Sequence, residues 1–293
     1  EPGQSAASGA RPPSVDARQP VSGAQQSAIP RRDALALNPR VAISSEQLEG
    51  SISLKGARFD DLKLRQYHIT VDPKSPEVSL FSPAHTQTPY FSEFGFIAAP
   101  GSNVALPGTS SEWQVEAGTK LTPQTPVTLR WDNGQGLVFH RKISLDENFL
   151  FTIADRIENN SGNAVTLYPY GLVSRMGKPD GSSYYILHEG FIGEFPNVGE
   201  QTIKYKNAAD DGPVQVSDSD GWLGMTDKYW AAALIPQTGE TFIANFSEHP
   251  DPAIENYQAD FRYDAQTIAA GGSLDLTSRL FAGAKVTKVI NSY

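Results

Sequence analysis

The chain has 293 residues, a formal net charge of −9, 39% hydrophobic residues and no cysteine. The negative charge argues against a general nucleic-acid-binding protein, which needs clustered lysine and arginine to displace the counterions of phosphates. The absence of cysteine excludes a disulfide framework, a thiolate metal site and a cysteine nucleophile. The sequence also contains no run of about 20 apolar residues, so it predicts no membrane-spanning helix.

Residues 1–43 differ in composition from the rest of the chain. The stretch EPGQSAASGARPPSVDARQPVSGAQQSAIPRRD is rich in Pro, Ala, Ser, Gly and Gln, and it contains no aromatic residue. Such a segment cannot bury enough apolar surface to offset the entropy that it would lose on ordering. We therefore predict a flexible linker over residues 1–43 and a single folded domain over residues 44–293.

From about Val41 onward, short runs rich in Val, Ile, Thr, Tyr and Phe alternate with turn residues, which is typical of strands and their connections. Residues 127–145 have the pattern of two strands around an Asp-Asn-Gly-Gln-Gly turn, and residues 149–175 have the pattern of a second pair. The four prolines of residues 72–91 predict an edge strand and a loop. Convincing helical periodicity is confined to a short segment from about Lys285.

These patterns predict an all-β fold. With roughly fifteen or more strands, the domain is too large for a seven-stranded immunoglobulin-like fold. We expect a large antiparallel β-sandwich of two sheets, with a short helical segment near the C-terminus.

The most apolar stretch is GWLGMTDKYWAAALIP, residues 221–236. It is too short to span a membrane, and Asp227 and Lys228 interrupt it. The pattern predicts two strands joined by a turn at residues 226–228, with apolar side chains on both faces. We therefore expect a central pair of strands, with Trp222 and Trp230 in the core.

Candidate catalytic residues are few. None of the five histidines has a second histidine at metal-ligand spacing, and no nucleophile elbow or phosphate-binding loop occurs. His188 and Glu189 are neighbours on a predicted strand, so their side chains point to opposite faces. His188 with Glu158 or Glu194 is the pairing to consider for a sugar mutarotase, and nothing in the spacing supports it.

The segment VSDSDGWLGMTD, residues 216–227, has a superficial likeness to a calcium-binding loop. Asp218, Asp220, Gly221 and Asp227 fall at ligand or turn positions, but the first position is Val and the last is not Glu. The flanks also look like strands, whereas the calcium motif needs helices. We expect a solvated turn and no metal site.

A platform of aromatic rings for sugar stacking is a further hypothesis, because large β-sandwiches can bind carbohydrate. The four tryptophans, Trp113, Trp131, Trp222 and Trp230, each lie within an apolar or alternating run. Packing in the core or on a sheet face is therefore the expected role. The sequence predicts no catalytic, cofactor-binding or metal-binding residue.

Four segments carry a family resemblance. They are LEGSISLKGARFDDLKLRQYHITVDPKSPEVSLFSP (48–83), PYFSEFGF (89–96), YYILHEGFIGEF (184–195) and GWLGMTDKYWAAALIP (221–236). In this order they resemble the large periplasmic domain of the bacterial membrane-protein insertase YidC, in its alphaproteobacterial form. The resemblance covers residues 44–293, and the Pro-rich start is similar to the linker that precedes this domain.

The resemblance implies a mutarotase-like β-sandwich that is held at the periplasmic side of the inner membrane by flanking transmembrane helices. It implies an accessory role in the insertion and folding of inner-membrane proteins. The partners would be components of the Sec translocon and nascent membrane proteins. No enzyme activity and no cofactor are implied. The alternative is a carbohydrate-binding or mutarotase-like protein on the same fold, because fold alone does not decide function.

Overall fold

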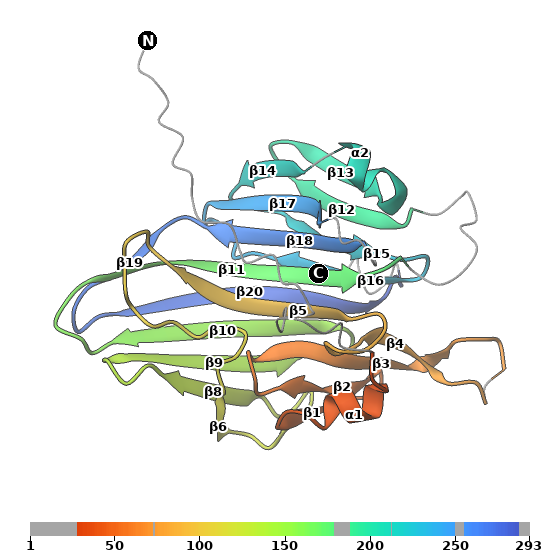
Figure 1. The fold of residues 1–293 in the computed structure, drawn as a ribbon, viewed down its shortest axis with the longest axis horizontal. Coiled ribbons are helices and arrows are strands. Elements are labelled where there is room, and N and C mark those ends of the chain that lie inside the picture. Colours follow the sequence, from red (N-terminus) through yellow and green to blue (C-terminus); the bar gives the residue numbers. More distant parts are fainter. Residues whose placement is uncertain (1–27, 73, 179–187, 212, 250–254, 287–293) are drawn as a thin grey trace, which may run out of the picture.

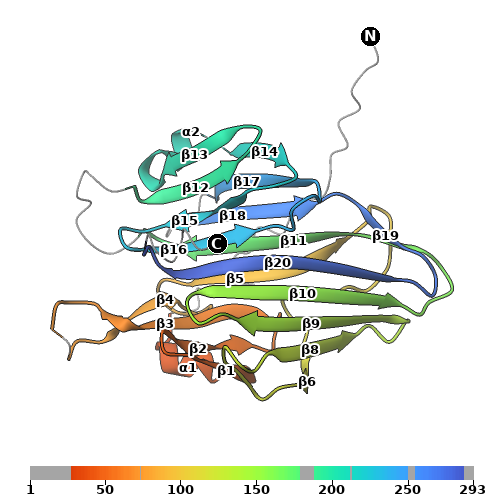
Figure 2. The same cartoon turned by 180° about the vertical axis from the view of Figure 1, so that it is seen from behind.

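The computed structural model describes residues 28–72, 74–178, 188–211, 213–249 and 255–286. These residues form two large β-sheets that lie face to face, as the two opposite views show (Figures 1 and 2). Among the described residues, helical structure is limited to three short segments, which are α1 (Arg31–Leu35), η1 (Tyr205–Asn207) and α2 (Ala208–Asp211). The predicted all-β sandwich is confirmed, and the helical segments η1 and α2 lie in its C-terminal half.

The first sheet has eleven strands and faces the reader in Figure 1. Along its main path the strands are β14 (Val214–Asp218), β17 (Phe242–His249), β18 (Asn256–Tyr263), β11 (Val165–Met176), β5 (Tyr90–Ala98), β3 (Arg58–His68), β2 (Leu48–Ser53), β1 (Arg40–Ser44) and β7 (Lys120–Leu121). Two short strands pair beside this path, β19 (Gln266–Ile268) with β11 and β4 (Glu77–Phe81) with β3. Every pairing in this sheet is antiparallel except that of β1 with β7.

The second sheet has nine strands and faces the reader in Figure 2. In spatial order they are β13 (Gly199–Lys204), β12 (Gly190–Phe195), β15 (Trp222–Thr226), β16 (Trp230–Ile235), β20 (Ser273–Ala284), β10 (Leu150–Asn159), β9 (Leu137–Leu145), β8 (Val127–Asp132) and β6 (Gln114–Ala117). One large apolar cluster, with members such as Phe59, Phe151 and Phe261, fills the space between the two sheets.

The two predicted strand pairs have different outcomes. Residues 127–145 form the antiparallel hairpin of β8 and β9, as predicted. The prediction that residues 149–175 form a second pair is wrong, because β10 lies in the nine-stranded sheet and β11 in the eleven-stranded sheet. The turn between them, at residues 160–164, crosses from one sheet to the other. Its Gly and Asn residues favour a change of chain direction, and this is compatible with a crossover between sheets as well as with a hairpin.

The apolar stretch at residues 221–236 forms the antiparallel pair β15 and β16, which lies inside the nine-stranded sheet as predicted. Ala232 and Leu234 are fully buried. Trp230 is only half-buried at the start of β16, and Tyr229 beside it is 53% exposed. The middle of the stretch therefore lies in the core, whereas the β15–β16 turn lies at the surface. The prediction of burial on both faces is wrong for the residues at this turn.

Secondary structure begins before residue 44. Helix α1 and most of β1 lie inside the range 1–43 that composition assigns to the linker. Short-range composition cannot detect a strand that is ordered by pairing with β2. Residues 1–27 lie outside the described residues, and so does most of the helical segment expected from Lys285, since residues 287–293 are not described. The proline-rich segment gives an edge strand, because β4 pairs with β3 alone.

Candidate functional site

The residues that sequence reasoning considered for catalysis do not converge. The His188 ring places Nε2 2.7 Å from the carbonyl oxygen of Phe191, on its own segment of chain. Glu194 is exposed on β12, and Glu158 lies on β10, four strands away across the sheet. Four strand spacings amount to roughly 19 Å. General acid–base catalysis needs its groups within hydrogen-bonding reach of one substrate, and these groups are not so placed.

The segment that is superficially similar to a calcium loop is a strand, a turn and a second strand. The carboxylate of Asp218 accepts hydrogen bonds from the backbone and side-chain nitrogens of Asn197, at 3.0 and 2.9 Å. Asp227 lies at the far end of β15 and pairs with Arg175 instead. In the described part of the chain, no three His, Cys, Asp or Glu side chains come close enough to hold a metal ion.

The four tryptophans do not form a platform. Trp113 is 4% exposed, with the guanidinium of Arg141 5.1 Å from its ring centre. Trp131 on β8 packs against the core at a strand position distant from Trp222 on β15, with four strands of the same sheet between them. Trp222 and Trp230 are half-buried against the core. Trp113 is therefore buried as expected, whereas the other three tryptophans pack against the core with only part of their surface.

A buried arginine marks the end of the sandwich at which β11 finishes and β16 begins. Arg175 on β11 donates a hydrogen bond from Nη1 to Oδ1 of Asp227 in the β15–β16 turn, at 2.5 Å. The Arg175 guanidinium also lies 4.7 Å from the ring centre of Tyr90 and 5.7 Å from that of Tyr205. The guanidinium of Arg175 is therefore contacted by residues of both sheets and of η1.

The electrostatics of this cluster favour a charged arginine among neutral phenols. Burial opposes the charge of Arg175, yet the nearby carboxylate of Asp227 holds the pKa of Arg175 above its ordinary value. Burial raises the pKa of Tyr90 and of Tyr205, so both phenols stay protonated. Among the described residues, Nε of Arg175 and the hydroxyl of Tyr205 are buried without a hydrogen-bond partner. Sequence reasoning missed this cluster, although a lone Arg in the apolar run YGLVSRM is a usable signal for a buried ion pair.

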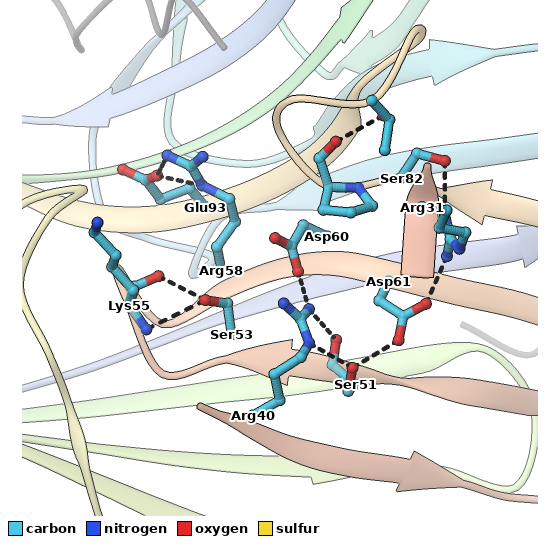
Figure 3. A network of polar contacts seen from close by, with 12 residues as sticks. Arg31, Arg40, Ser51, Ser53, Lys55, Arg58, Asp60, Asp61, Ser82 and Glu93 are labelled. Atoms are coloured by element: carbon cyan, nitrogen blue, oxygen red, sulfur yellow. Dashed lines mark hydrogen bonds and ion pairs between the residues drawn. The ribbon is translucent and has the colours of Figure 1, made fainter. Parts of the chain in front are cut away.

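A second polar network joins α1 to the first three strands (Figure 3). Arg31 on α1 bonds Asp61 on β3 at 2.5 Å, and Ser51 on β2 donates to the other oxygen of Asp61 at 2.6 Å. Arg40 on β1 forms an ion pair with Asp60. Burial raises the pKa of Asp60, and Arg40 opposes that rise. The network ties α1 and β1, which composition assigned to the linker, to the body of the sheet.

A shallow cavity of about 400 Å³ lies beside this network. Its lining residues are Arg31, Arg32, Leu35, Glu49, Gly50, Asp61 and Lys63. Arg31 and Asp61 in this lining pair with each other, although Nε of Arg31 is buried without a hydrogen-bond partner. The lining also mixes cationic and anionic side chains, so it does not point to one class of ligand.

The outer face of the eleven-stranded sheet carries buried polar residues that are paired with one another. Glu93 on β5 accepts hydrogen bonds from Arg58 at 2.7 Å and from the hydroxyl of Tyr170 at 2.9 Å, and part of this group is drawn in Figure 3. Burial, followed by the charge of Glu93, raises the pKa of Tyr170 well above its usual range. Farther along, Asn245 donates to Asp260 at 2.8 Å. Such satisfied networks stabilise a fold and leave no activated nucleophile or base.

Architecture and site together define a class: a β-sandwich of the galactose-mutarotase type in which no catalytic set is assembled by the described residues. A galactose mutarotase related enzyme from Lactobacillus acidophilus superposes with a TM-score of 0.57 at 12% identity, over 85% of this chain and 100% of that chain. A putative aldose 1-epimerase from Escherichia coli K12 superposes with a TM-score of 0.52 at 10% identity, over 84% and 99%. At such low identity these likenesses show the fold alone.

The sequence comparisons go further. The sequence pattern of the YidC periplasmic domain matches residues 40–293. "Membrane protein insertase YidC" of Nitrobacter hamburgensis is 49% identical over 265 residues, which are 90% of this chain and 44% of that protein. The protein of the same name from Methylobacterium radiotolerans is 47% identical over 290 residues, which are 96% and 46%. The chain belongs to the YidC periplasmic domain family, and the predicted resemblance is confirmed.

The match covers only part of each relative. The chain spans less than half the length of the two curated relatives above. Within the part of the chain that the structure describes, the helices are all too short or too polar to cross a bilayer. The family match assigns the domain.

Proposed function

We propose that this domain is the periplasmic accessory module of an inner-membrane protein insertase. In this role it contacts the Sec translocon and newly made inner-membrane proteins, and it carries out no chemical reaction of its own. The observation that supports the proposal is the family match over residues 40–293, with relatives that are named as membrane protein insertases. The dispersed positions of His188, Glu158 and Glu194 fit a protein that acts through surfaces.

Surfaces for protein partners are best sought at exposed apolar side chains, because these lose water on binding. Leu37 after α1, Val115 on β6 and Val198 before β13 are 57%, 40% and 52% exposed. They lie on separate elements and so sample three regions of the molecule. The polar Glu200 on β13 is also exposed and serves as a control position.

The test is site-specific photocrosslinking in a full-length insertase that contains this domain. A photoreactive amino acid is placed at position 37, 115, 198 or 200, and the adducts formed in native membranes are identified. We expect an adduct with a translocon subunit or a nascent membrane protein at one or more of the three apolar positions. If none of the positions gives such an adduct while a probe in the transmembrane region does, the proposed contacts are wrong.

Sugar binding is the alternative that the fold raises, and the same chain can be tested for it. Trp113 is too buried to stack on a sugar ring, whereas Trp131, Trp222 and Trp230 are half-buried, and Trp222 is the one chosen for substitution. Calorimetric titration with monosaccharides and glycans should detect no binding. Millimolar or tighter binding that is lost in Trp222→Ala would favour the carbohydrate function instead.

A further inference from the structure

The connection between β3 and β4 presents two bare aliphatic side chains at its tip. In Figure 1 this hairpin extends beyond the rest of the sandwich, at the end where β16 begins. Ile69 is 67% exposed and Val71 is 105% exposed, which makes them the two most exposed large hydrophobic side chains among the described residues. Soluble surfaces carry single exposed aliphatic residues routinely, but a pair on a projecting tip is the kind of feature that marks an interaction site.

The described residues of the tip make several hydrogen bonds with one another. The backbone nitrogen of Ile69 donates to the carbonyl oxygen of Pro76 at 3.0 Å. The His68 ring nitrogen Nδ1 lies 2.7 Å from the carbonyl oxygen of Ser75, and the backbone nitrogen of Lys74 donates to Asp72 at 2.9 Å. A hairpin whose backbone groups pair within it loses fewer hydrogen bonds when it leaves bulk water, whereas the exposed charged residues Asp72 and Lys74 keep the tip at the depth of the headgroups.

Aromatic side chains surround the base of the hairpin. The ring of Tyr67, two residues before Ile69, lies 5.1 Å from the ring of Trp230, and Trp230 lies 5.8 Å from Tyr229. The ammonium group of Lys228 lies 4.9 Å from the ring centre of the exposed Tyr229. Tyr and Trp rings with a lysine beside them combine apolar and polar parts, which suits the boundary between lipid headgroups and acyl chains.

We infer that this end of the domain docks on a lipid bilayer, with Ile69 and Val71 entering the headgroup region and Tyr229 resting at its level. A stable protein–protein interface buries at least ~1,200 Å² in total, which is more than a narrow tip with two aliphatic side chains offers. The same tip is sufficient for weak interfacial binding that acts when the domain is already tethered to a membrane. The inference rests on the proposed function only in requiring that a membrane is nearby.

The absence of cysteine in the sequence permits a direct test. Val71→Cys is labelled with a polarity-sensitive fluorophore and mixed with protein-free vesicles of phosphatidylethanolamine and phosphatidylglycerol. The matched control is Val198→Cys, an exposed valine on the β12–β13 turn. We expect a blue shift and increased intensity at position 71 as lipid is added, and no change at position 198.

Binding itself is measured by vesicle co-sedimentation of unlabelled chains. The double variant Ile69→Asp, Val71→Asp should lower the partition coefficient about tenfold or more, since it removes the buried aliphatic groups. The variant Val115→Asp, Val198→Asp makes the same charge change elsewhere and should partition like the wild type. Circular dichroism establishes that both variants are folded.

Several results would overturn the inference. One is a label at position 71 that does not respond to lipid, and another is an equal loss of partitioning in both double variants. A third is a label that responds only to vesicles carrying membrane proteins and not to vesicles of the same lipids, which would make the tip a protein contact. The crosslinking test of the proposed function probes protein partners and does not involve positions 69 and 71, so either idea can fail while the other stands.

Discussion

The guanidinium of Arg175 on β11 and the carboxylate of Asp227 in the β15–β16 turn form an ion pair of 2.5 Å between the two sheets of the sandwich. The two side chains are 10% and 15% exposed, so both charges have lost most of their water. A charge in such a place is stable only while its partner is present. The pair therefore holds the β15–β16 turn in one position relative to the opposite sheet.

Arg175→Met is expected to destabilise the domain by roughly 3–5 kcal/mol, because Asp227 would remain buried and unpaired. The free energy of unfolding from urea titration measures this loss. The double variant Arg175→Met, Asp227→Leu should recover part of it, since no unpaired charge remains. Lys178→Met is the matched control, because Lys178 and Glu255 form a pair of similar length that is nearly half exposed, and its loss should cost under about 1 kcal/mol. Equal losses in the buried and exposed variants would contradict the role given to Arg175.

Gly224 on β15 is required by the close approach of β16. A Cβ atom at this position would lie 2.1 Å from the backbone oxygen of Ala232, and backbone cannot move aside as a flexible side chain can. Gly224→Ala should therefore reduce the free energy of unfolding by about 1–3 kcal/mol. Gly162→Ala is the control, because a Cβ atom there meets nothing within 4 Å, and its effect should stay within about 0.5 kcal/mol. A melting temperature unchanged in Gly224→Ala would show that β15 and β16 lie farther apart than described.

The sequence predicts the class of fold well because strand periodicity is a local property. The β8–β9 hairpin and the β15–β16 pair follow from apolar runs around turn residues, and both are present. The turn between β10 and β11 has similar residues but crosses between sheets. Whether a turn closes a hairpin or crosses between sheets depends on where the next strand finds its partners. Strand β11 pairs with β5 and β18, whose paired residues lie about 80 positions before it and about 90 after it in the chain.

The candidate sites are predicted less well, for a related reason. A charged residue on a strand is expected to face water, and only its surroundings reveal that it is buried. Arg175 gains its role from Tyr90, Tyr205 and Asp227, which are dispersed along the sequence. The exposure of Ile69 and Val71 likewise depends on how far the hairpin projects from the sandwich, and this distance cannot be predicted from the amino-acid composition of the segment.

Asp218 makes the stability of the domain depend on pH in the acidic range. Burial of Asp218 works against its charged form, but backbone N–H groups of Asn197, Ser219 and Asp220 bond the carboxylate and hold its pKa below the usual 3.8. A carboxyl group with a lowered pKa in the folded state stabilises the fold above its unfolded pKa, and this contribution is lost as the pH falls through the folded pKa. Stability should therefore decline below about pH 4.

Asp218→Asn should make this acid decline shallower, because the variant has no carboxylate to protonate. The free energy of unfolding is measured by denaturant titration from about pH 7 to about pH 2.5, over which bound protons differ between the two states. Glu200→Gln, which changes an exposed carboxylate on β13, is the control and should keep the slope of the wild type. The same slope in Asp218→Asn as in the wild type would show that other groups govern the acid response.

The tryptophans should rank in stability according to burial. Trp113 is 4% exposed and has the Arg141 guanidinium against its ring, so Trp113→Ala should cost about 3–5 kcal/mol through the cavity that it leaves. Trp230 is half-buried against Tyr67, and Trp230→Ala should cost about 1–2 kcal/mol because less apolar area is involved. Urea titrations of both variants measure the order. A larger loss of stability for Trp230→Ala than for Trp113→Ala would show that Trp230 is the more deeply buried of the two. It would also contradict the lipid-docking inference, which needs the β15–β16 turn to lie at the surface.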